Sequence, residues 1–115
     1  MSENCIFCQI VAGKAPGEIV YKDEQVTAFR DQQPAAPVHL LIVPARHITS
    51  LNRISEADEG LLGHLIIVAR KLAEKFLISQ SGYRFIINTG PDAGQTVFHL
   101  HAHLMGGKPL SGLKR

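Results

Sequence analysis

One internal stretch, residues 97–105, constrains this chain more than any other. Within it His99, His101 and His103 alternate with small or apolar residues. Because successive side chains of a strand point to opposite faces, this spacing predicts a half-buried strand with three imidazoles on one face. A helix would spread the same rings over about 200° of its surface. Purification tags and metal-binding histidine tracts offer a plainer explanation, but a tag is consecutive and terminal and has no core residues between its histidines.

A row of histidines suits phosphoryl chemistry. The unperturbed pKa of imidazole lies near neutrality, so one neutral ring can attack an electrophile while a neighbour donates a proton or a hydrogen bond. Residues 90–96 read Gly-Pro-Asp-Ala-Gly-Gln-Thr, a glycine-rich loop whose backbone N–H groups can hold an anion. Loop and strand together predict phosphate chemistry on a histidine nucleophile.

The tract also carries a family resemblance. Residues 99–105, His-Leu-His-Ala-His-Leu-Met, resemble the signature of the histidine triad (HIT) family. Residues 94–98, Gly-Gln-Thr-Val-Phe, are similar to the lead-in of its nucleoside phosphoramidase branch, and the resemblance runs from Ile6 to Gly107. It implies an α+β, HIT-like fold: a five-stranded, mainly antiparallel sheet with one long and one short helix, paired into a homodimer.

Length and composition set broad limits. The chain has 115 residues, of which 45% are hydrophobic, so a single domain spanning residues 1–115 with one core is expected. No apolar run approaches a membrane span, and the first residues lack the features of a signal peptide, which favours a cytoplasmic protein without a membrane partner. The net charge of +2 is too small and scattered for a nucleic-acid surface, whereas small phosphorylated ligands fit it.

Hydrophobic periodicity locates the elements. A short helix is expected at 5–13. Strands are expected at 18–22, 26–31, 38–44, 83–88 and in the histidine tract. Ser55 and Asp58 form a capping box that should begin a helix running to about residue 78. Its apolar face is wider than one sheet contact needs, and Gly60 and Gly63 lie within it. This predicts a dimer contact; packing on the chain's own sheet is the alternative.

The resemblance also assigns roles at the reacting centre. It implies that His101 attacks the α-phosphorus, and that His103 and His39 hold the non-bridging oxygens. Gln95 and Thr96 would contact the leaving group, and backbone N–H groups near Gly94 to Val97 would add donors. Asn88 matches a family position that binds ribose or phosphate, although an Asn before Thr-Gly can also simply shape a turn.

By the same resemblance, an apolar pocket holds the nucleoside. Its expected wall consists of Ile6, Phe7, Ile10 and Phe29, and the Asp31 carboxylate would accept hydrogen bonds from the ribose hydroxyls. Taken alone, Phe7 and Ile10 fit equally well as core residues. Two positions depart from the family pattern: Gln32 replaces an apolar residue, and Thr96 stands where many relatives have serine. These departures should affect base preference and leaving-group tolerance.

The two cysteines form the motif Cys5-Ile-Phe-Cys8. In a reducing compartment a disulfide is not expected, and no βαβ pattern of a redox protein surrounds the pair. Two such thiolates could supply half of a tetrahedral zinc site. The resemblance to zinc-binding bacterial members completes the set as Cys5, Cys8, His47 and His99. It implies one structural zinc per chain, and the chemistry would need no cofactor.

The leading hypothesis is therefore a hydrolase that cleaves purine nucleoside 5′-phosphoramidates, such as AMP joined to an amine or to lysine, through a nucleotidyl-His101 intermediate. A second enzymatic hypothesis is dinucleoside polyphosphate hydrolysis or nucleotidyl transfer by the same histidine. A third is a nucleotide-binding adaptor whose hydrolysis is incidental.

Overall fold

A computed structural model describes residues 4–111 of the chain. Five strands form one sheet in the order β1-β2-β3-β5-β4, and every neighbouring pair is antiparallel. The strands are β1 (Ile19–Lys22), β2 (Val26–Arg30), β3 (Val38–Pro44), β4 (Tyr83–Ile86) and β5 (Ala102–Gly106). The helices are α1 (Ile6–Val11) and α2 (Glu59–Lys75), with short 3-10 turns at Leu51–Arg53, Glu56–Asp58 and Pro91–Ala93. The α+β architecture with one long and one short helix is confirmed.

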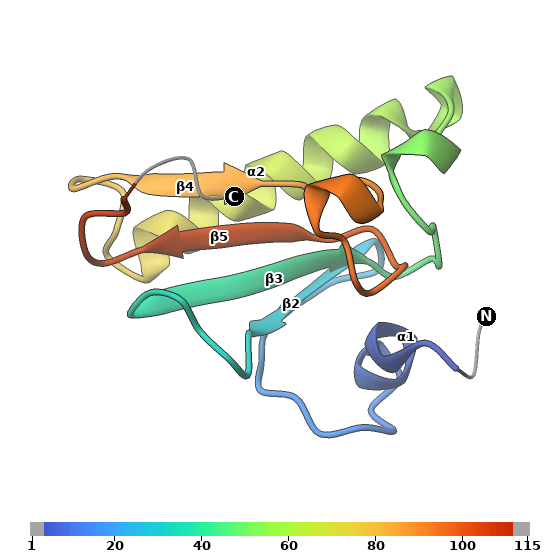
Figure 1. Cartoon of the computed structure of the whole chain (residues 1–115), viewed down its shortest axis with the longest axis horizontal. Coiled ribbons are helices and arrows are strands. Elements are labelled where there is room, and N and C mark those ends of the chain that lie inside the picture. The colour runs from blue at the N-terminus through green and yellow to red at the C-terminus, as the bar shows by residue number, and fades with distance from the viewer. Residues whose placement is uncertain (1–3, 112–115) are drawn as a thin grey trace.

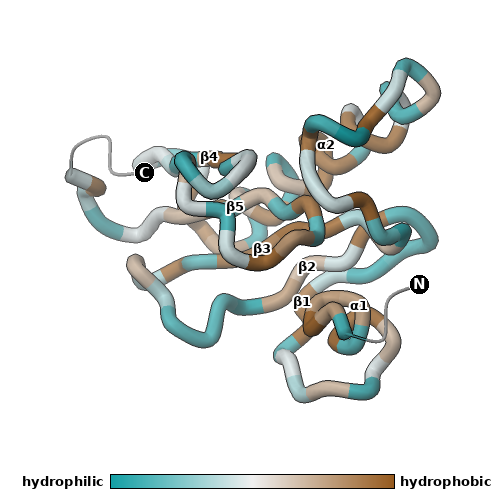
Figure 2. The backbone as a smooth tube through the Cα atoms, turned by 45° about the vertical axis from the view of Figure 1, so that its right-hand side comes forward, coloured by the Kyte–Doolittle hydropathy of each residue, from teal (hydrophilic) through white to brown (hydrophobic). Residues whose placement is uncertain are grey.

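The two helices lie on opposite faces of the sheet (Figure 1). Residues of α2 such as Leu65, Val68 and Leu72 are buried against Leu40 and Ile42 of the sheet in the main core. Helix α1 contributes to a second, smaller cluster on the other face. The strand that separates the two cores, β3, is hydrophobic along most of its length (Figure 2), and every residue after Val38 in it is buried. Helix α1 covers only part of its face of the sheet, and this is the face that carries the histidines, here called the histidine face.

Pairing between β3 and β5 brings distant histidines together. His39 lies opposite Met105, and Leu41 lies opposite His103. On the other side of β5, Ile86 of β4 lies opposite His103. Since side chains alternate across a strand, His39 and His103 emerge on the same face, one register step apart. The sheet therefore assembles a histidine cluster from segments about sixty residues apart.

The histidine tract is only partly a regular strand. Strand β5 begins at Ala102, so His99 and His101 lie in the extended segment before it. There the Leu100 N–H donates to the carbonyl of Ile48, in the loop after β3. The prediction of a strand over the whole tract was wrong at its first half, because this segment bonds to that loop and not to a neighbouring strand.

Other boundaries also differ from the prediction. The capping box at Ser55 and Asp58 is confirmed, but it begins a 3-10 turn that leads into α2. Helix α2 ends at Lys75 and not near residue 78, because Leu77 adopts a left-handed conformation with φ of 62°. Strand β4 ends at Ile86, two residues before the predicted end.

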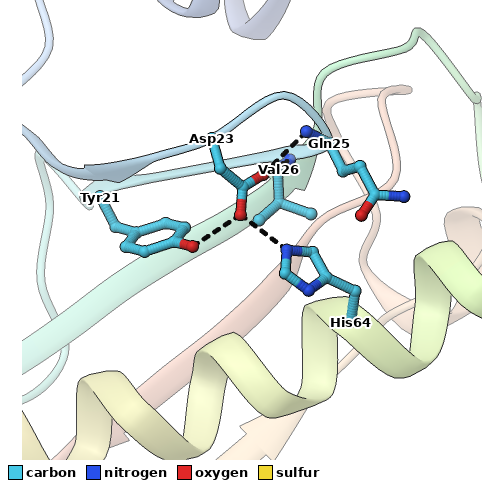
Figure 3. Close-up of polar contacts among 5 residues, drawn as sticks. All are labelled: Tyr21, Asp23, Gln25, Val26 and His64. Carbon is cyan, nitrogen blue, oxygen red and sulfur yellow. Dashed lines mark hydrogen bonds and ion pairs between the residues drawn. The ribbon is translucent and has the colours of Figure 1, made fainter.

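A polar cluster that the sequence did not indicate ties the β1–β2 turn to α2 (Figure 3). Asp23 Oδ2 accepts hydrogen bonds from Tyr21 Oη and His64 Nε2, each at 2.6 Å. Asp23 Oδ1 accepts from the N–H groups of Gln25 and Val26. Burial raises the pKa of Asp23, but these hydrogen bonds outweigh it and hold that pKa well below its usual range. The ionised carboxylate thus links three elements.

The outer side of α2 exposes two large apolar side chains beside its charged ones. The Ile66 and Ile67 side chains are 53% and 45% exposed. A Cβ at Gly60 or Gly63 would meet nothing within 4 Å, so no backbone of the described chain packs against these glycines. Among the described residues, no helix combines the length and apolarity that crossing a membrane requires.

Candidate active site and metal cluster

His101 is held with one ring nitrogen available. Its Nδ1 lies 2.8 Å from the carbonyl oxygen of His99 and donates to it, because a carbonyl can only accept. In the neutral ring the proton is therefore on Nδ1, and Nε2 carries a free lone pair. The edge of the Phe7 ring packs against the imidazole at 5.1 Å between centroids, which fixes its plane. A buried, oriented and unprotonated Nε2 is the arrangement that a nucleophile needs.

His39 and His103 form a directional hydrogen-bond chain. The Ala35 N–H donates to His39 Nδ1 at 3.0 Å, so this nitrogen must be the acceptor of the ring. His39 Nε2 then carries the proton and donates to His103 Nδ1 at 3.0 Å. His103 in turn carries its proton on Nε2. The backbone amide of residue 35 thereby sets the tautomer of both rings, and His103 presents an N–H donor beside the lone pair of His101.

Asp31 adjoins this chain. Its Oδ2 lies 3.3 Å from His39 Nε2, beside the hydrogen bond from His39 to His103. Asp31, His39 and His103 each offer one ligand atom, and these atoms lie within 4.8 Å of one another, close enough to hold a metal ion. A metal on His39 Nε2 would need that nitrogen unprotonated and a proton on Nδ1, where the Ala35 N–H already points. Asp31, His39 and His103 therefore fit a chain of hydrogen bonds better than a second metal site.

Burial keeps the three rings neutral near pH 7. Burial lowers the pKa of His39, and the nearby Asp31 only partly opposes this effect. Burial likewise lowers the pKa of His101. Burial, reinforced by His101 and His39, lowers the pKa of His103 to about 4. The cluster thus holds unprotonated nitrogens and neutral donors at physiological pH.

A cleft of about 610 Å³ opens between α1, β2 and the histidines. It brings together ten residues of the expected binding set: Ile6, Phe7, Ile10, Phe29, Asp31, Gln32, Thr96, Val97, His101 and His103. Pro16, Arg30, Gln33 and Leu41, which sequence reasoning did not single out, complete the wall. Its wall combines apolar side chains with the Asp31 carboxylate, as a site for a base and a ribose would require.

Gln95 and Gly94 lie within the glycine-rich loop and not on the cleft wall. The Gln95 side chain is 4% exposed, and its Nε2 donates to the carbonyls of Thr49 and Val97. Its Oε1 accepts from the Gly90 N–H. The N–H groups of Gly94 and Gln95 donate inside the loop as well. The Gln95 side chain thus supports the loop that presents Thr96, and its expected contact with a leaving group stays a prediction.

Asn88 lies on the other side of His103. It lines a smaller cavity of about 330 Å³ over β5 and β4, together with His39, His103 and Arg84. Asn88 lies two residues beyond Ile86, the last residue of β4. This position also fits the alternative role of shaping a turn. His103 is the one described residue that lines both cavities.

Four metal-ligand side chains converge beside the cleft. The ligand atoms of Cys5, Cys8, His47 and His99 all lie within 4.8 Å of one another. Cys5 Sγ is 3.3 Å from His99 Nδ1, and Cys8 Sγ is 3.3 Å from His47 Nδ1. A tetrahedral zinc with ordinary bond lengths separates its S and N ligands by about 3.6 Å. The two thiols are free of disulfide and buried, as a structural site requires.

The tautomer of His99 also fits a metal ligand. Its Nε2 donates to the Pro44 carbonyl at 2.9 Å, so Nδ1 directs its lone pair at the thiols. A ligating histidine in proteins generally donates its other N–H in this way. The residues present therefore suit zinc: two cysteines and two histidines would close the tetrahedron, leaving no position for substrate.

Comparisons with known proteins agree with this geometry. A model of the HIT domain matches residues 12–110. The chain belongs to the HIT family. Purine nucleoside phosphoramidase from Escherichia coli K12 is 48% identical over 110 residues, which cover 96% of this chain and 92% of that protein. The structure of a HIT family hydrolase from Clostridium thermocellum matches with a TM-score of 0.95 and 45% identity over all of both chains. Another from Legionella pneumophila has a TM-score of 0.93 at 42% identity, covering 96% and 98%.

Sequence reasoning missed two features of this HIT protein. The contact between Asp31 and His39 joins the ribose-binding candidate to the proton chain, and nothing in the linear spacing signals it. The smaller cavity has Arg84 and Lys108 in its wall, from segments that carried no motif. The alternation of Arg84 and Ile86 along β4 places both on the histidine face, which strand register could have revealed.

Proposed function

We propose that this HIT-family hydrolase cleaves purine nucleoside 5′-phosphoramidates to nucleoside monophosphates through a covalent nucleotidyl-His101. The observation that carries the proposal is the pair of complementary ring nitrogens. The His99 carbonyl leaves a lone pair on His101 Nε2, and the chain from Ala35 leaves an N–H on His103 Nε2. A nucleophile and an oxyanion donor thus face the same space.

In the first step His101 Nε2 attacks the α-phosphorus, forming a P–N bond as the bond to the leaving amine breaks. The leaving nitrogen takes up a proton from solvent water, and the Thr96 hydroxyl on the cleft wall hydrogen-bonds to it. His103 and His39 stabilise the charge on the non-bridging oxygens. The Nδ1–H bond to the His99 carbonyl stabilises the positive charge that develops on the His101 ring.

In the second step a water oxygen attacks the same phosphorus, the P–N bond to His101 breaks, and the water loses one proton to solvent as the monophosphate leaves. The P–N bond to imidazole is labile, so one difficult displacement is divided into two easier ones. His101 returns to its starting tautomer because the His99 carbonyl holds the Nδ1 proton throughout. Apart from water and its protons, the enzyme's own residues thus supply the groups that the two displacements need.

The larger cleft supports a nucleoside as the constant part of the substrate. Phe7 and Phe29 meet edge to face at 5.3 Å and offer an apolar wall for a base. Asp31 at the rim can accept from both hydroxyls of a ribose. The name of the Escherichia coli relative favours a purine.

The cluster of Cys5, Cys8, His47 and His99 is proposed to hold one structural zinc ion. The ion would tie α1 to the loop after β3 and to the segment that carries His101. It supplies stability, while the displacements use only the histidines and Thr96.

We also propose that the protein acts as a cytoplasmic homodimer. The exposed Ile66 and Ile67 and the open surface at Gly60 and Gly63 support α2 as part of the contact between two copies. Neither Cys5 nor Cys8 forms a disulfide, which suits a reducing compartment.

Mass spectrometry of the intact protein, quenched rapidly without acid during turnover of adenosine 5′-phosphoramidate, tests the mechanism. The expected result is a nucleotidyl adduct on the native protein and none on the His101→Ala variant, together with loss of AMP release by the variant. Asp92→Asn, an exposed change in the loop before Thr96, is the matched control and should form the adduct normally.

AMP release that persists in His101→Ala would overturn the covalent mechanism. Tight AMP binding by the native protein without either adduct or release would instead support a nucleotide-binding adaptor. Release from a dinucleoside polyphosphate at a higher kcat/KM than from the phosphoramidate would favour the polyphosphate hydrolase.

A further inference from the structure

The side chains of His39, His101 and His103, here called the histidine ridge, lie between two cavities. The larger cleft lies on the α1 side, and the smaller cavity lies over β5, β4 and the segment that follows β5. In Figure 1 that segment turns back toward β4 after the end of β5. A phosphorus atom held between His101 and His103 therefore has space for a substituent on each side. On the proposed function, the nucleoside fills the larger cleft, so the smaller cavity faces the other substituent.

The floor of the smaller cavity follows from strand register. Arg84 on β4 and His39 on β3 both lie opposite Met105 of β5, one on either side. Ile86 occupies the corresponding place beside His103, one step nearer to the reacting centre. The floor thus runs from the histidine ridge, across an apolar patch, to the guanidinium of Arg84.

The wall of this cavity is cationic. Arg84 and Lys108 both line it, and none of the described residues in its lining is acidic. Arg84 Nη2 donates to the Leu110 carbonyl at 3.4 Å, which steadies the guanidinium. Among residues 4–111 its other N–H groups have no hydrogen-bond acceptor, so they can serve a ligand. Asn88 adds an amide, and Ser111 adds a hydroxyl. A planar guanidinium with polar neighbours recognises carboxylate and phosphate groups.

We infer that this cavity is a leaving-group subsite that selects amines or acids carrying their own carboxylate or phosphate. Arg84 is its specificity-determining residue, and Lys108 reinforces it. The inference deepens the proposed function, on which it rests. Amino-acid-like leaving groups bind with their anionic end on Arg84 and their reacting nitrogen at the histidine ridge. An amine with a second positive charge in place of the anion is disfavoured by repulsion from Arg84 and Lys108.

Two matched substrates test the subsite. Both are adenosine 5′-phosphoramidates, one with 3-aminopropanoate as the leaving amine and the other with 3-aminopropanamide. They are nearly equal in size and differ in one negative charge. The measurement is the ratio of kcat/KM for the carboxylate to kcat/KM for the amide. Comparing this ratio between variants cancels the intrinsic reactivities of the two substrates.

Arg84→Gln should lower the ratio about fivefold, corresponding to about 1 kcal/mol for a partly exposed ion pair. Arg84→Lys keeps a charge at the site and should retain most of the preference. Lys108→Gln should lower the ratio less, and the native ratio should fall as salt is added, because screening weakens exposed charge pairs. Arg70→Gln, on α2 at the opposite face of the sheet, is the matched control and should leave the ratio unchanged.

An Arg84→Gln ratio equal to that of the native protein would overturn the subsite, as would equal ratios for Arg84→Gln and Arg84→Lys at a lowered value. In both cases the phosphoramidase activity itself would stand. Failure of the native protein to release AMP from either substrate would instead remove the proposed function, and the subsite with it.

Discussion

Asp23→Asn should destabilise the fold at a point remote from the histidines. The amide of asparagine keeps an oxygen for the Gln25 and Val26 N–H groups, but its NH₂ cannot accept the hydrogen bonds that Tyr21 and His64 now donate to Oδ2. A hydrogen bond to a charged group contributes about 1.5–3 kcal/mol. The Asp23 and His64 side chains are 28% and 33% exposed, so solvent reduces the sum. We expect a loss of about 2 kcal/mol, or about 8 °C in Tm.

The pH dependence of this loss is a sharper test. The pKa of Asp23 is lowered in the folded state, so its contribution is complete above the unfolded value of about 3.9 and declines as the pH falls below it. At pH 3 the native protein should have lost about 1.3 kcal/mol of this contribution. The difference between the native protein and Asp23→Asn should therefore shrink to under about 1 kcal/mol.

Urea denaturation followed by far-ultraviolet circular dichroism at a fixed protein concentration measures both values, since the chain has no tryptophan for fluorescence. Glu24→Gln, an exposed change in the same turn, is the matched control and should alter stability by less than about 0.5 kcal/mol. A loss in Asp23→Asn as small as that of the control, or one that stays constant between pH 7 and pH 3, would refute the reasoning.

Three further predictions concern the site. His39→Leu removes the donor that sets the His103 tautomer, so kcat for adenosine 5′-phosphoramidate should fall about 10- to 100-fold. An unchanged kcat would exclude a catalytic role for this hydrogen-bond chain. Cys8→Ser should lose bound zinc and melt at a lower temperature while retaining some activity; full metal content with intact melting would contradict the cluster. Because the pKa of His103 is about 4, activity should be insensitive to this group above pH 5 and decline below pH 4, where its charged ring no longer accepts from His39. A rate that rises on acidification through pH 4 would contradict this.

The alternation of His99, His101 and His103 was enough to predict that their rings gather on one side of the sheet, whereas the reaction at His101 stays a prediction. Periodicity and capping also predicted most of the fold, because Ser55 and the apolar stripe of α2 act through neighbours along the chain. The end of α2 was missed because the left-handed turn at Leu77 is set by its surroundings and not by its residue type. Local signals were informative where local interactions decide the structure.

The hydrogen-bond partners could not be predicted in this way. No pattern in the sequence indicates that the amide of Ala35 sets two tautomers or that the carbonyl of His99 orients His101. Backbone groups carry no residue identity, so their part in a site becomes visible only when the chain is folded. Arg84 was overlooked for a related reason: its position relative to His103 depends on the pairing of β4 with β5.

The pairing of β3 with β5 has a consequence for folding. The meander of β1, β2 and β3 closes through short turns and needs only nearby partners, whereas β5 must return across about sixty residues to reach β3. Contacts of such long sequence separation are entropically costly and form slowly. In a partly folded chain, β1, β2 and β3 have paired but β5 has not yet joined β3. His39 is then in position, whereas His101 and His103 are not. Enzymatic activity should therefore reappear in refolding only with this last long-range contact, and partly folded molecules should not consume substrate.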